Sequence, residues 1–239
     1  MSEALPVLYE RHGAQVAVIT LNRPEKKNAI NLQMAELIRS YLRQADNDDT
    51  IRAIVLTGQP AVFSAGMDVT AFRQGELPIV TPEGFGGLIH AQIAKVIIAA
   101  VDGIAYGGGF ELALACDLIV AGQNARFSFP ETGLGLVAAQ GGCARLPARV
   151  SPYVALDWLL TGRTVGAREA LSHGAISRIS EGSAREEALR IAEQIAGKDL
   201  AASLAVKAIV RQGLTQREAP SFDFQQAPVE RLRQAAARR

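Results

Sequence analysis

The stretch IAYGGGFELALACD, from Ile104 to Asp117, is the most informative part of this chain. Three consecutive glycines precede an apolar run with helical spacing, and a carboxylate, Glu111, stands two residues after the last glycine. Glycine permits positive φ and close approach of the backbone. The N-terminus of a helix offers unpaired N–H groups and a partial positive charge. We therefore expect a helix start that can hold a developing oxyanion, with Glu111 about one turn away as a candidate general acid or base.

The glycines could also belong to a nucleotide-binding motif or have a purely structural function. A dinucleotide fingerprint is excluded because Leu112 stands where G-x-G-x-x-G requires its third glycine, and the chain contains no G-x-x-x-x-G-K-[ST] phosphate loop. A purely structural use, in which the glycines let a helix pack closely on a strand, stays open from this segment alone.

The composition is that of an ordinary globular protein. The 239 residues are 49% hydrophobic and 21% charged, with a formal net charge of +1, so no basic field indicates nucleic acid as a partner. The cysteines, Cys116 and Cys143, form no C-x-x-C pair, and His12, His90 and His173 lack zinc-ligand spacing, so no metal is expected. Without a secretory signal or a long apolar run, we expect a cytoplasmic protein with no membrane contact.

Strand and helix patterns alternate up to about residue 180, which indicates an α/β fold with largely parallel strands. Residues 63–68 are predicted to form a loop, and residues 73–87, rich in Gly and Pro, a mobile surface segment. Strands are expected at 7–11, 15–21, 53–56, 96–101, 118–121, 126–129 and 175–179, and helices at 34–42, after the glycines, near 143, at 153–160, at 167–173 and from 183 onward.

Six motifs in a fixed order resemble the crotonase (enoyl-CoA hydratase/isomerase) superfamily over roughly residues 5–210. The motifs are LNRP at 21–24 with NA at 28–29, FSAGMD at 63–68, AAVDGIAYGGGFEL at 99–112, FPE at 129–131 with Gly135, GG at 141–142 with RL at 145–146, and LTGR at 160–163. The resemblance implies a crotonase-type spiral of ββα turns over residues 1–195. It also implies a helical C-terminal trimerisation region over residues 196–239, and a homotrimer or a dimer of trimers.

The resemblance further implies a hydro-lyase of the enoyl-CoA hydratase type, active in fatty acid β-oxidation, which adds water reversibly and syn to a 2-enoyl-CoA thioester. Coenzyme A is then part of the substrate, and no separate cofactor is needed. The backbone N–H groups of Met67 and Gly108 match the family's oxyanion hole, and Glu111 and Glu131 match its two glutamates. We expect Glu131 to exchange the α-proton and Glu111 to activate the water. Because two close carboxylates cannot both ionise easily, one pKa is expected to rise toward neutrality.

Positions that match the family's contacts with CoA and substrate lie in three separate segments. Lys26 and Lys27 are equally compatible with solvated surface charges, and Asp68 is also expected to organise its own loop. The candidates are Lys26, Lys27, Ala29, Ala65, Asp68 and Val137.

Two departures from the family pattern leave the acyl group of the substrate undetermined. Family hydratases read GIPxxGGTQRL after the second glutamate, whereas residues 135–146 read GLVAAQGGCARL, with Cys143-Ala144 in place of Thr-Gln. Residues 84–88, 107–114 and 146–147 resemble carnitinyl-CoA dehydratase, which suggests a polar or branched acyl group. The C-terminal region is shortened and lacks the S-x-D-x-x-E-G segment, so a more open CoA site is expected. The alternatives are a carnitinyl-CoA-type dehydratase, a Δ3-Δ2-enoyl-CoA isomerase, or a non-catalytic acyl-CoA-binding relative.

Overall fold

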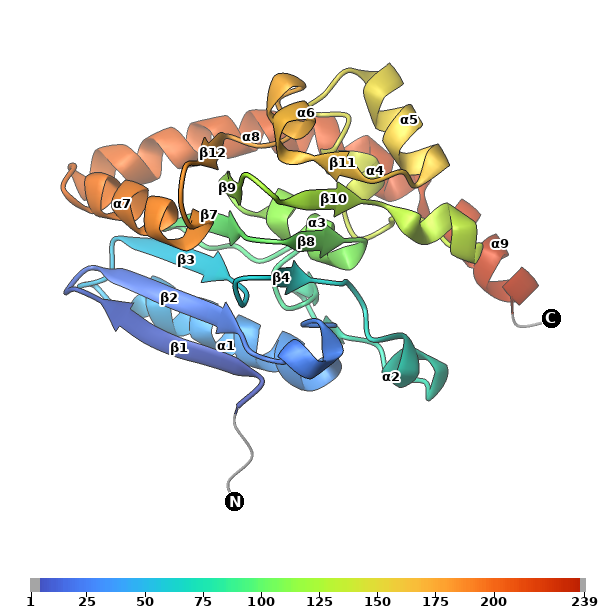
Figure 1. Cartoon of the computed structure of the whole chain (residues 1–239), viewed down its shortest axis with the longest axis horizontal. Helices are drawn as coiled ribbons and strands as arrows, with labels where there is room; N and C mark the ends of the chain where they lie inside the picture. Colours follow the sequence, from blue (N-terminus) through green and yellow to red (C-terminus); the bar gives the residue numbers. More distant parts are fainter. Residues whose placement is uncertain (1–4, 237–239) are drawn as a thin grey trace.

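The chain forms two main sheets and passes repeatedly from one sheet to the other (Figure 1). The structure is a computed structural model that describes residues 5–236. The larger sheet has the order β1 (Val7–His12), β2 (Val16–Leu21), β3 (Ala53–Thr57), β7 (Val96–Val101), β9 (Leu118–Gly122) and β12 (Arg178–Ser180). The smaller sheet has the order β11 (Val165–Gly166), β10 (Arg126–Ser128), β8 (Ile104–Tyr106) and β4 (Val62–Ser64).

A strand–strand–helix unit repeats three times along the chain. Each central strand of the larger sheet leads directly into a strand of the smaller one: β3 into β4, β7 into β8, and β9 into β10. A helix follows each pair: α2 (Val69–Arg73), α3 (Gly108–Ala115) and the 3-10 helix η2 (Pro130–Leu134). The pairings among β2, β3, β7, β9 and β12 are parallel, as are those among β4, β8 and β10. The α/β class and the ββα turns expected from the sequence are therefore present.

The N-terminal elements form as the sequence pattern predicts. Strands β1 and β2 make an antiparallel hairpin, and the amphipathic segment becomes helix α1 (Leu32–Asn47). Asn31 caps this helix, because its side chain accepts a hydrogen bond from the Met34 N–H. Met34, Ile38 and Leu42 are fully buried at the spacing of one helical face.

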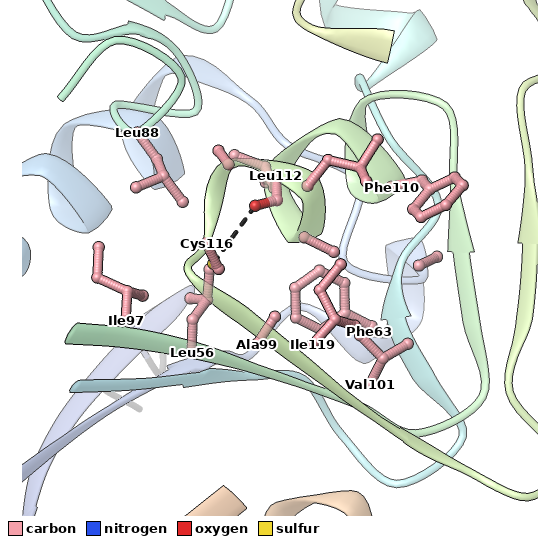
Figure 2. Packing of buried hydrophobic residues seen from close by; sticks show 14 of the residues in the cluster. Leu56, Phe63, Leu88, Ile97, Ala99, Val101, Phe110, Leu112, Cys116 and Ile119 are labelled. Carbon is pink, nitrogen blue, oxygen red and sulfur yellow. Dashed lines mark hydrogen bonds between the residues drawn. The ribbon is translucent and has the colours of Figure 1, made fainter. Parts of the chain in front are cut away.

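The main hydrophobic core lies between the larger sheet, α1 and α3 (Figure 2). Leu56, Ala99 and Ile119 are neighbours in register on β3, β7 and β9 and point to the same face. Helix α3 packs on them and is buried along its whole length, which accounts for its lack of a polar face. The alternate residues, such as Val55 and Ile98, point to the other face, where helix α7 (Ala184–Ala196) covers them.

The prediction of a surface segment at residues 73–87 is confirmed for residues 73–82, most of which are exposed, and is wrong for residues 83–87. The segment contains a small hairpin of β5 (Ile79–Val80) and β6 (Gly84–Phe85), and residues 83–89 are all buried. Gly84, Gly86 and Gly87 have positive φ, so these glycines serve tight turns that press the apolar side chains inward. Glu83 pairs with Arg43 of α1 and ties the segment to the core.

Other differences are small shifts of element boundaries. The loop expected at 63–68 begins inside β4, and the strand expected at 175–179 forms as β12 three residues later. The remaining elements are η1 (Pro24–Lys26), α4 (Gly142–Arg145), α5 (Pro152–Thr161), α6 (Ala167–Ser172), α8 (Leu200–Phe224) and α9 (Gln226–Ala236). The predicted C-terminal region, 196–239, extends beyond the described residues. No helix within residues 5–236 is both long and apolar enough to span a membrane.

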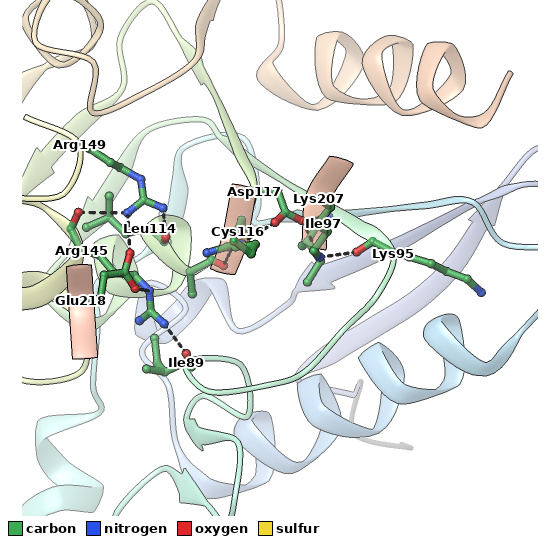
Figure 3. Close-up of polar contacts among 12 residues, drawn as sticks. Ile89, Lys95, Ile97, Leu114, Cys116, Asp117, Arg145, Arg149, Lys207 and Glu218 are labelled. Atoms are coloured by element: carbon green, nitrogen blue, oxygen red, sulfur yellow. Dashed lines mark hydrogen bonds and ion pairs between the residues drawn. The ribbon is translucent and has the colours of Figure 1, made fainter. Parts of the chain in front are cut away.

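Helix α8 is held on the core by an ion-pair network around Asp117, at the start of β9 (Figure 3). The Asp117 carboxylate accepts hydrogen bonds from Arg211 Nε and from the Ile97 N–H, each at 2.8 Å, and pairs with Lys207 Nζ at 2.8 Å. Lys207 also donates to the Lys95 carbonyl oxygen at 2.7 Å. Through these contacts Asp117 joins α8 to β7 and to the end of α3, which is a structural function.

We expect Asp117→Asn to lower the free energy of unfolding by roughly 3 kcal/mol, because it leaves Lys207 and Arg211 half-buried without a counter-charge. Urea unfolding measures the change. Asp157→Asn is the matched control, since the Asp157–Arg163 pair is exposed and contributes less than about 1 kcal/mol. Equal losses in the two variants would contradict the prediction.

Candidate active site

Three loops meet at one edge of the smaller sheet. Strands β4, β8 and β10 are neighbours and run parallel, so the segments that follow Ser64, Tyr106 and Ser128 leave the sheet side by side. The Gly107 N–H donates to the Ser128 carbonyl oxygen at 2.9 Å and extends the pairing past the strand ends. The sequence motifs around Met67, Gly108 and Glu131 are thereby brought to one place.

Two backbone N–H groups at this edge are free to bind an acceptor. Gly66 lies against the start of α3, since a Cβ atom on Gly66 would be 3.1 Å from the Gly108 nitrogen. Gly108 is the first residue of α3, where the N–H has no partner within the helix. Within residues 5–236, neither the Met67 nor the Gly108 N–H donates a hydrogen bond. The residues on either side of Met67 are paired with Ile30: the Gly66 carbonyl oxygen accepts from the Ile30 N–H, and the Asp68 N–H donates to the Ile30 carbonyl oxygen.

Glu111 is almost completely buried, with 3% of its surface exposed. Its Oε1 accepts a hydrogen bond from the Gly142 N–H at 2.9 Å. Burial raises the pKa of Glu111 to about 8, and the charge of Glu131 adds to the increase. Glu111 is therefore mostly protonated at neutral pH.

Glu131 lies beside the first glycine of the triplet. A Cβ atom on Gly107 would be 2.8 Å from Glu131 Oε1, so only glycine leaves room for this carboxyl group. Its Oε2 is buried and has no hydrogen-bond partner within residues 5–236. Burial raises the pKa of Glu131 to about 7. The sequence predicted that one carboxyl pKa would approach neutrality, and in the structure both are raised.

Residues 138–145, which we call the wall segment, close the site beside Glu111. The Gly142 N–H that binds Glu111 belongs to this segment, and the Cys143 N–H donates to the Ala138 carbonyl oxygen at 3.0 Å. Burial raises the pKa of the half-buried Cys143 thiol to about 11, and the charges of Glu111 and Glu131 act in the same direction. The thiol is thus neutral and close to both carboxyl groups. Cys116 lies elsewhere, buried at the end of α3 (Figure 2).

The predicted CoA-binding positions of the N-terminal turn and the loop after β4 come together. The Ala65 N–H donates to the Lys27 carbonyl oxygen at 2.9 Å, and the side chains of Lys26 and Lys27 are exposed. The half-buried Ala29 lies in the same turn, whereas the half-buried Val137 directly precedes the wall segment in the chain. That any of these residues contacts CoA stays a prediction.

Asp68 already has partners within the protein. Its Oδ1 accepts hydrogen bonds from the N–H groups of Thr70 and Ala71 and caps α2, and its Oδ2 pairs with Arg23 at 2.8 Å. These contacts support the expectation that Asp68 organises its loop. They leave its predicted contact with CoA or substrate without support from the geometry.

Sequence reasoning missed two neighbours of the site. The ring of Phe85 lies against Gly108, where an added Cβ would be 2.5 Å from the ring, so this buried side chain packs on the candidate oxyanion hole. The Gly142 N–H is the hydrogen-bond donor to Glu111. Gly142 was visible only as part of a motif, and Phe85 lay in the segment misjudged as surface. Within residues 5–236, no group of three or more His, Cys, Asp or Glu side chains is arranged to hold a metal ion.

The raised pKa of Glu111 makes a prediction about stability. Between its usual pKa of 4.5 and its folded pKa of about 8, the folded state binds more protons than the unfolded state, so this group's contribution to stability is lost as the pH rises. We expect the free energy of unfolding of Glu111→Gln to depend less on pH than that of the wild type between about pH 5 and 8. Urea unfolding at several pH values tests this, and parallel profiles would contradict it.

Comparison with known proteins shows the family of this chain. Residues 11–239 match the model of the enoyl-CoA hydratase/isomerase family, and the chain belongs to that family. The predicted membership of the crotonase superfamily is thereby confirmed.

Two sets of relatives agree with this assignment. The chain is 41% identical over 216 residues to a carnitinyl-CoA dehydratase of Citrobacter koseri, which covers 88% of this chain and 81% of the relative. The solved structure of a carnitinyl-CoA dehydratase from Mycobacterium avium superimposes with a TM-score of 0.90 at 38% identity, covering 96% of this chain and 92% of that chain. An enoyl-CoA hydratase from Mycobacterium tuberculosis gives a TM-score of 0.85 at 36% identity, covering 95% and 89%. These neighbours confirm the predicted fold class.

Proposed function

We propose that this protein is a hydro-lyase that adds water reversibly across the double bond of a 2-enoyl-CoA thioester. One observation carries the proposal: two carboxyl groups with pKa values raised toward neutrality lie beside two backbone N–H groups that have no partner among residues 5–236. Membership of the enoyl-CoA hydratase/isomerase family supports it, as do relatives named as dehydratases and hydratases.

The N–H groups of Met67 and Gly108 would bind the thioester oxygen. Removing or adding a proton at the α-carbon places negative charge on this oxygen, and a preorganised donor of this kind contributes about 3–4 kcal/mol to the transition state. Both N–H groups belong to backbone that is held by its neighbours, so little reorganisation is needed.

The two carboxyl groups would exchange the protons. In dehydration, ionised Glu131 takes the α-proton of a 3-hydroxyacyl thioester, and protonated Glu111 gives its proton to the departing hydroxyl, which leaves as water. Both pKa values are raised toward neutrality, so one carboxyl group can start ionised while the other starts protonated. Hydration runs the same steps in reverse, so that Glu111 activates the water and Glu131 protonates the α-carbon. No separate cofactor enters this scheme.

An isomerase is a weaker alternative, because Δ3-Δ2 isomerisation needs one carboxyl group and no water. A carnitinyl-CoA-type dehydratase uses the chemistry proposed here with a polar acyl group, and its support is the 41% identity to a protein of that name. A non-catalytic acyl-CoA-binding protein has no use for two carboxyl groups with raised pKa values.

We further propose that the protein works in the cytoplasm as a homotrimer or a dimer of trimers. Val206, Ile209 and Val210 are exposed on α8, and an exposed apolar patch on a helix favours covering by another chain. Sedimentation of the purified protein tests this assembly, and a monomer at micromolar concentration would exclude it.

The activity is tested by incubating the protein with straight-chain, branched and polar 2-enoyl-CoA thioesters in ¹⁸O-labelled water. Loss of enoyl absorbance with label in the 3-hydroxyacyl product supports the proposal. A shifted double bond without label indicates isomerisation, and binding without turnover of any thioester indicates a binding protein. Either result would overturn the hydro-lyase assignment.

A further inference from the structure

One face of the C-terminal end of α8 contacts the wall segment. Glu218, Phe222 and Gln225 lie at i, i+4 and i+7, so they share one side of the helix. Glu218 Oε2 is 3.4 Å from Arg145 Nε, and the Phe222 ring centre is 5.2 Å from the Arg145 guanidinium carbon. Gln225, directly after α8, donates from Nε2 to the Ala139 carbonyl oxygen at 2.8 Å. Three consecutive turns of backbone from a distant part of the sequence thus reach residues 139–145.

The wall segment depends on such contacts for its position. Its helix, α4, has only four residues, and so short a helix has little stability of its own. Arg145 anchors the end of α4, because its Nη2 donates to the Ile89 carbonyl oxygen at 2.6 Å and its backbone N–H binds the Gly141 carbonyl oxygen. At the other end of the same helix, the Gly142 N–H binds Glu111 at 2.9 Å. Movement of Arg145 would therefore move the hydrogen-bond donor of a candidate catalytic carboxyl group.

Arg145 and Glu218 are both buried, with 7% and 5% of their surfaces exposed (Figure 3). A buried guanidinium is costly unless an opposite charge accompanies it, and removing one partner of a buried pair is strongly destabilising. Arg149 lies on the other side of the Glu218 carboxylate, at 4.0 Å, and Arg211 adds a further positive charge nearby. Glu218 is therefore the negative charge that lets Arg145 stay buried beside the wall segment.

We propose that Glu218 is a positioning residue of the active site, which acts through Arg145 to hold the wall segment where the Gly142 N–H binds Glu111. Phe222 and Gln225 support the same segment from the same helix face. The C-terminal helix thus takes part in arranging the active site of its own chain. The catalytic consequence of this proposal rests on the proposed function, whereas its structural part does not.

Hydrogen–deuterium exchange of the purified proteins tests the structural part without any assay of activity. In Glu218→Gln we expect the amides of residues 138–145 to exchange at least about tenfold faster than in the wild type, because the segment opens more often. Lys207→Met is the matched control, since it breaks an ion pair between α8 and the core, with Asp117, but does not touch the wall segment. Unchanged exchange in Glu218→Gln, or equal acceleration in both variants, would overturn the proposal.

The pH dependence of kcat tests the link to Glu111. Burial raises the pKa of Glu111 and the charge of Glu131 adds to it, whereas the N–H groups of Gly142 and Gln140 and the charge of Arg145 oppose it. The neutral Cys143 thiol is the other titratable group nearby. If the wall segment moves away, water reaches Glu111 and burial, the largest cause of its raised pKa, weakens, so the alkaline limb of kcat for dehydration should shift downward by about 0.5–1 pH unit. The Lys207→Met profile should match that of the wild type.

Gln225→Ala separates positioning from a through-space effect of charge, because it removes the hydrogen bond to Ala139 without changing any charge. If the wall segment stayed in place, loss of the Glu218 charge would leave Arg145 uncompensated, and the limb would move downward in Glu218→Gln alone. A downward shift in Glu218→Gln with none in Gln225→Ala, or no shift in either variant, would overturn the positioning proposal even if exchange were faster. If the wild type hydrates none of the thioesters, the proposed function fails, and the exchange experiment still decides the structural part.

Discussion

Glu131→Gln is expected to lower kcat for dehydration by about 10²–10⁴-fold, the usual contribution of a general acid or base. The amide has nearly the same shape as the carboxyl group but cannot accept the α-proton. Glu131 Oε2 has no hydrogen-bond partner within residues 5–236, so the replacement breaks no contact at that atom. The substrate KM should change little, because the Met67 and Gly108 N–H groups remain. Steady-state kinetics over a range of 3-hydroxyacyl thioesters measures both constants.

Glu111→Gln should reduce kcat to a similar degree, because dehydration needs both carboxyl groups. We expect the double variant to be little slower than either single one, since the two groups act as a unit. Glu186→Gln is the control, because this exposed carboxylate lies on α7 away from the site, and its kcat should equal that of the wild type. If both single variants keep more than about a tenth of the activity, the two-carboxyl mechanism is wrong.

Gly109→Ala should lower kcat by about 100-fold and also destabilise the fold. Its Cβ atom would overlap the carbonyl oxygen of Ser64 in β4, which is backbone and cannot turn aside. The start of α3 must then move away from β4, and the Gly108 N–H moves away from the Met67 N–H with it. A misplacement of about 1 Å in a catalytic group can cost about 10² in rate.

Gly213→Ala is the matched control for this prediction. Gly213 lies inside α8 with nothing within 4 Å of the added Cβ, so the variant should be more stable by about 0.4–1 kcal/mol with an unchanged kcat. Thermal unfolding and kcat of the two alanine variants give the comparison. Gly109→Ala with wild-type kcat would show that the separation of the two N–H groups is not critical.

Much of the fold could be predicted because its signals are local. The buried strand at 96–101, the amphipathic helix around Met34 and the glycine triplet each appear in a few consecutive residues. The surface prediction failed at residues 83–87 because their composition resembles a surface loop, while their glycines serve turns that bury Phe85. Glycine and proline content predicts where turns form, but it does not predict whether the residues in a turn are buried or exposed.

Some residues of the candidate site could be identified from the sequence, and others could not. The motifs identified Met67, Gly108, Glu111 and Glu131 as candidates, and their place at one sheet edge follows from the parallel pairing of β4, β8 and β10. Glu218 had no signal of its own, because it is one acidic residue in a helix that is otherwise largely exposed. Its importance depends on Arg145, 73 positions earlier in the chain.

The sequence by itself determined the family, the alternation of strands and helices, and the identity of the candidate groups. These follow from the order of the motifs and the spacing of hydrophobic residues, which are features of consecutive residues and need no knowledge of the folded structure. Only the tertiary structure decided how acidic these groups are and what holds them. The pKa of Glu111 is raised to about 8 because α3 is buried beneath the wall segment, and that segment is held by a helix from the far end of the chain. Burial and counter-charge depend on contacts between distant residues, and such contacts exist only after the chain has folded.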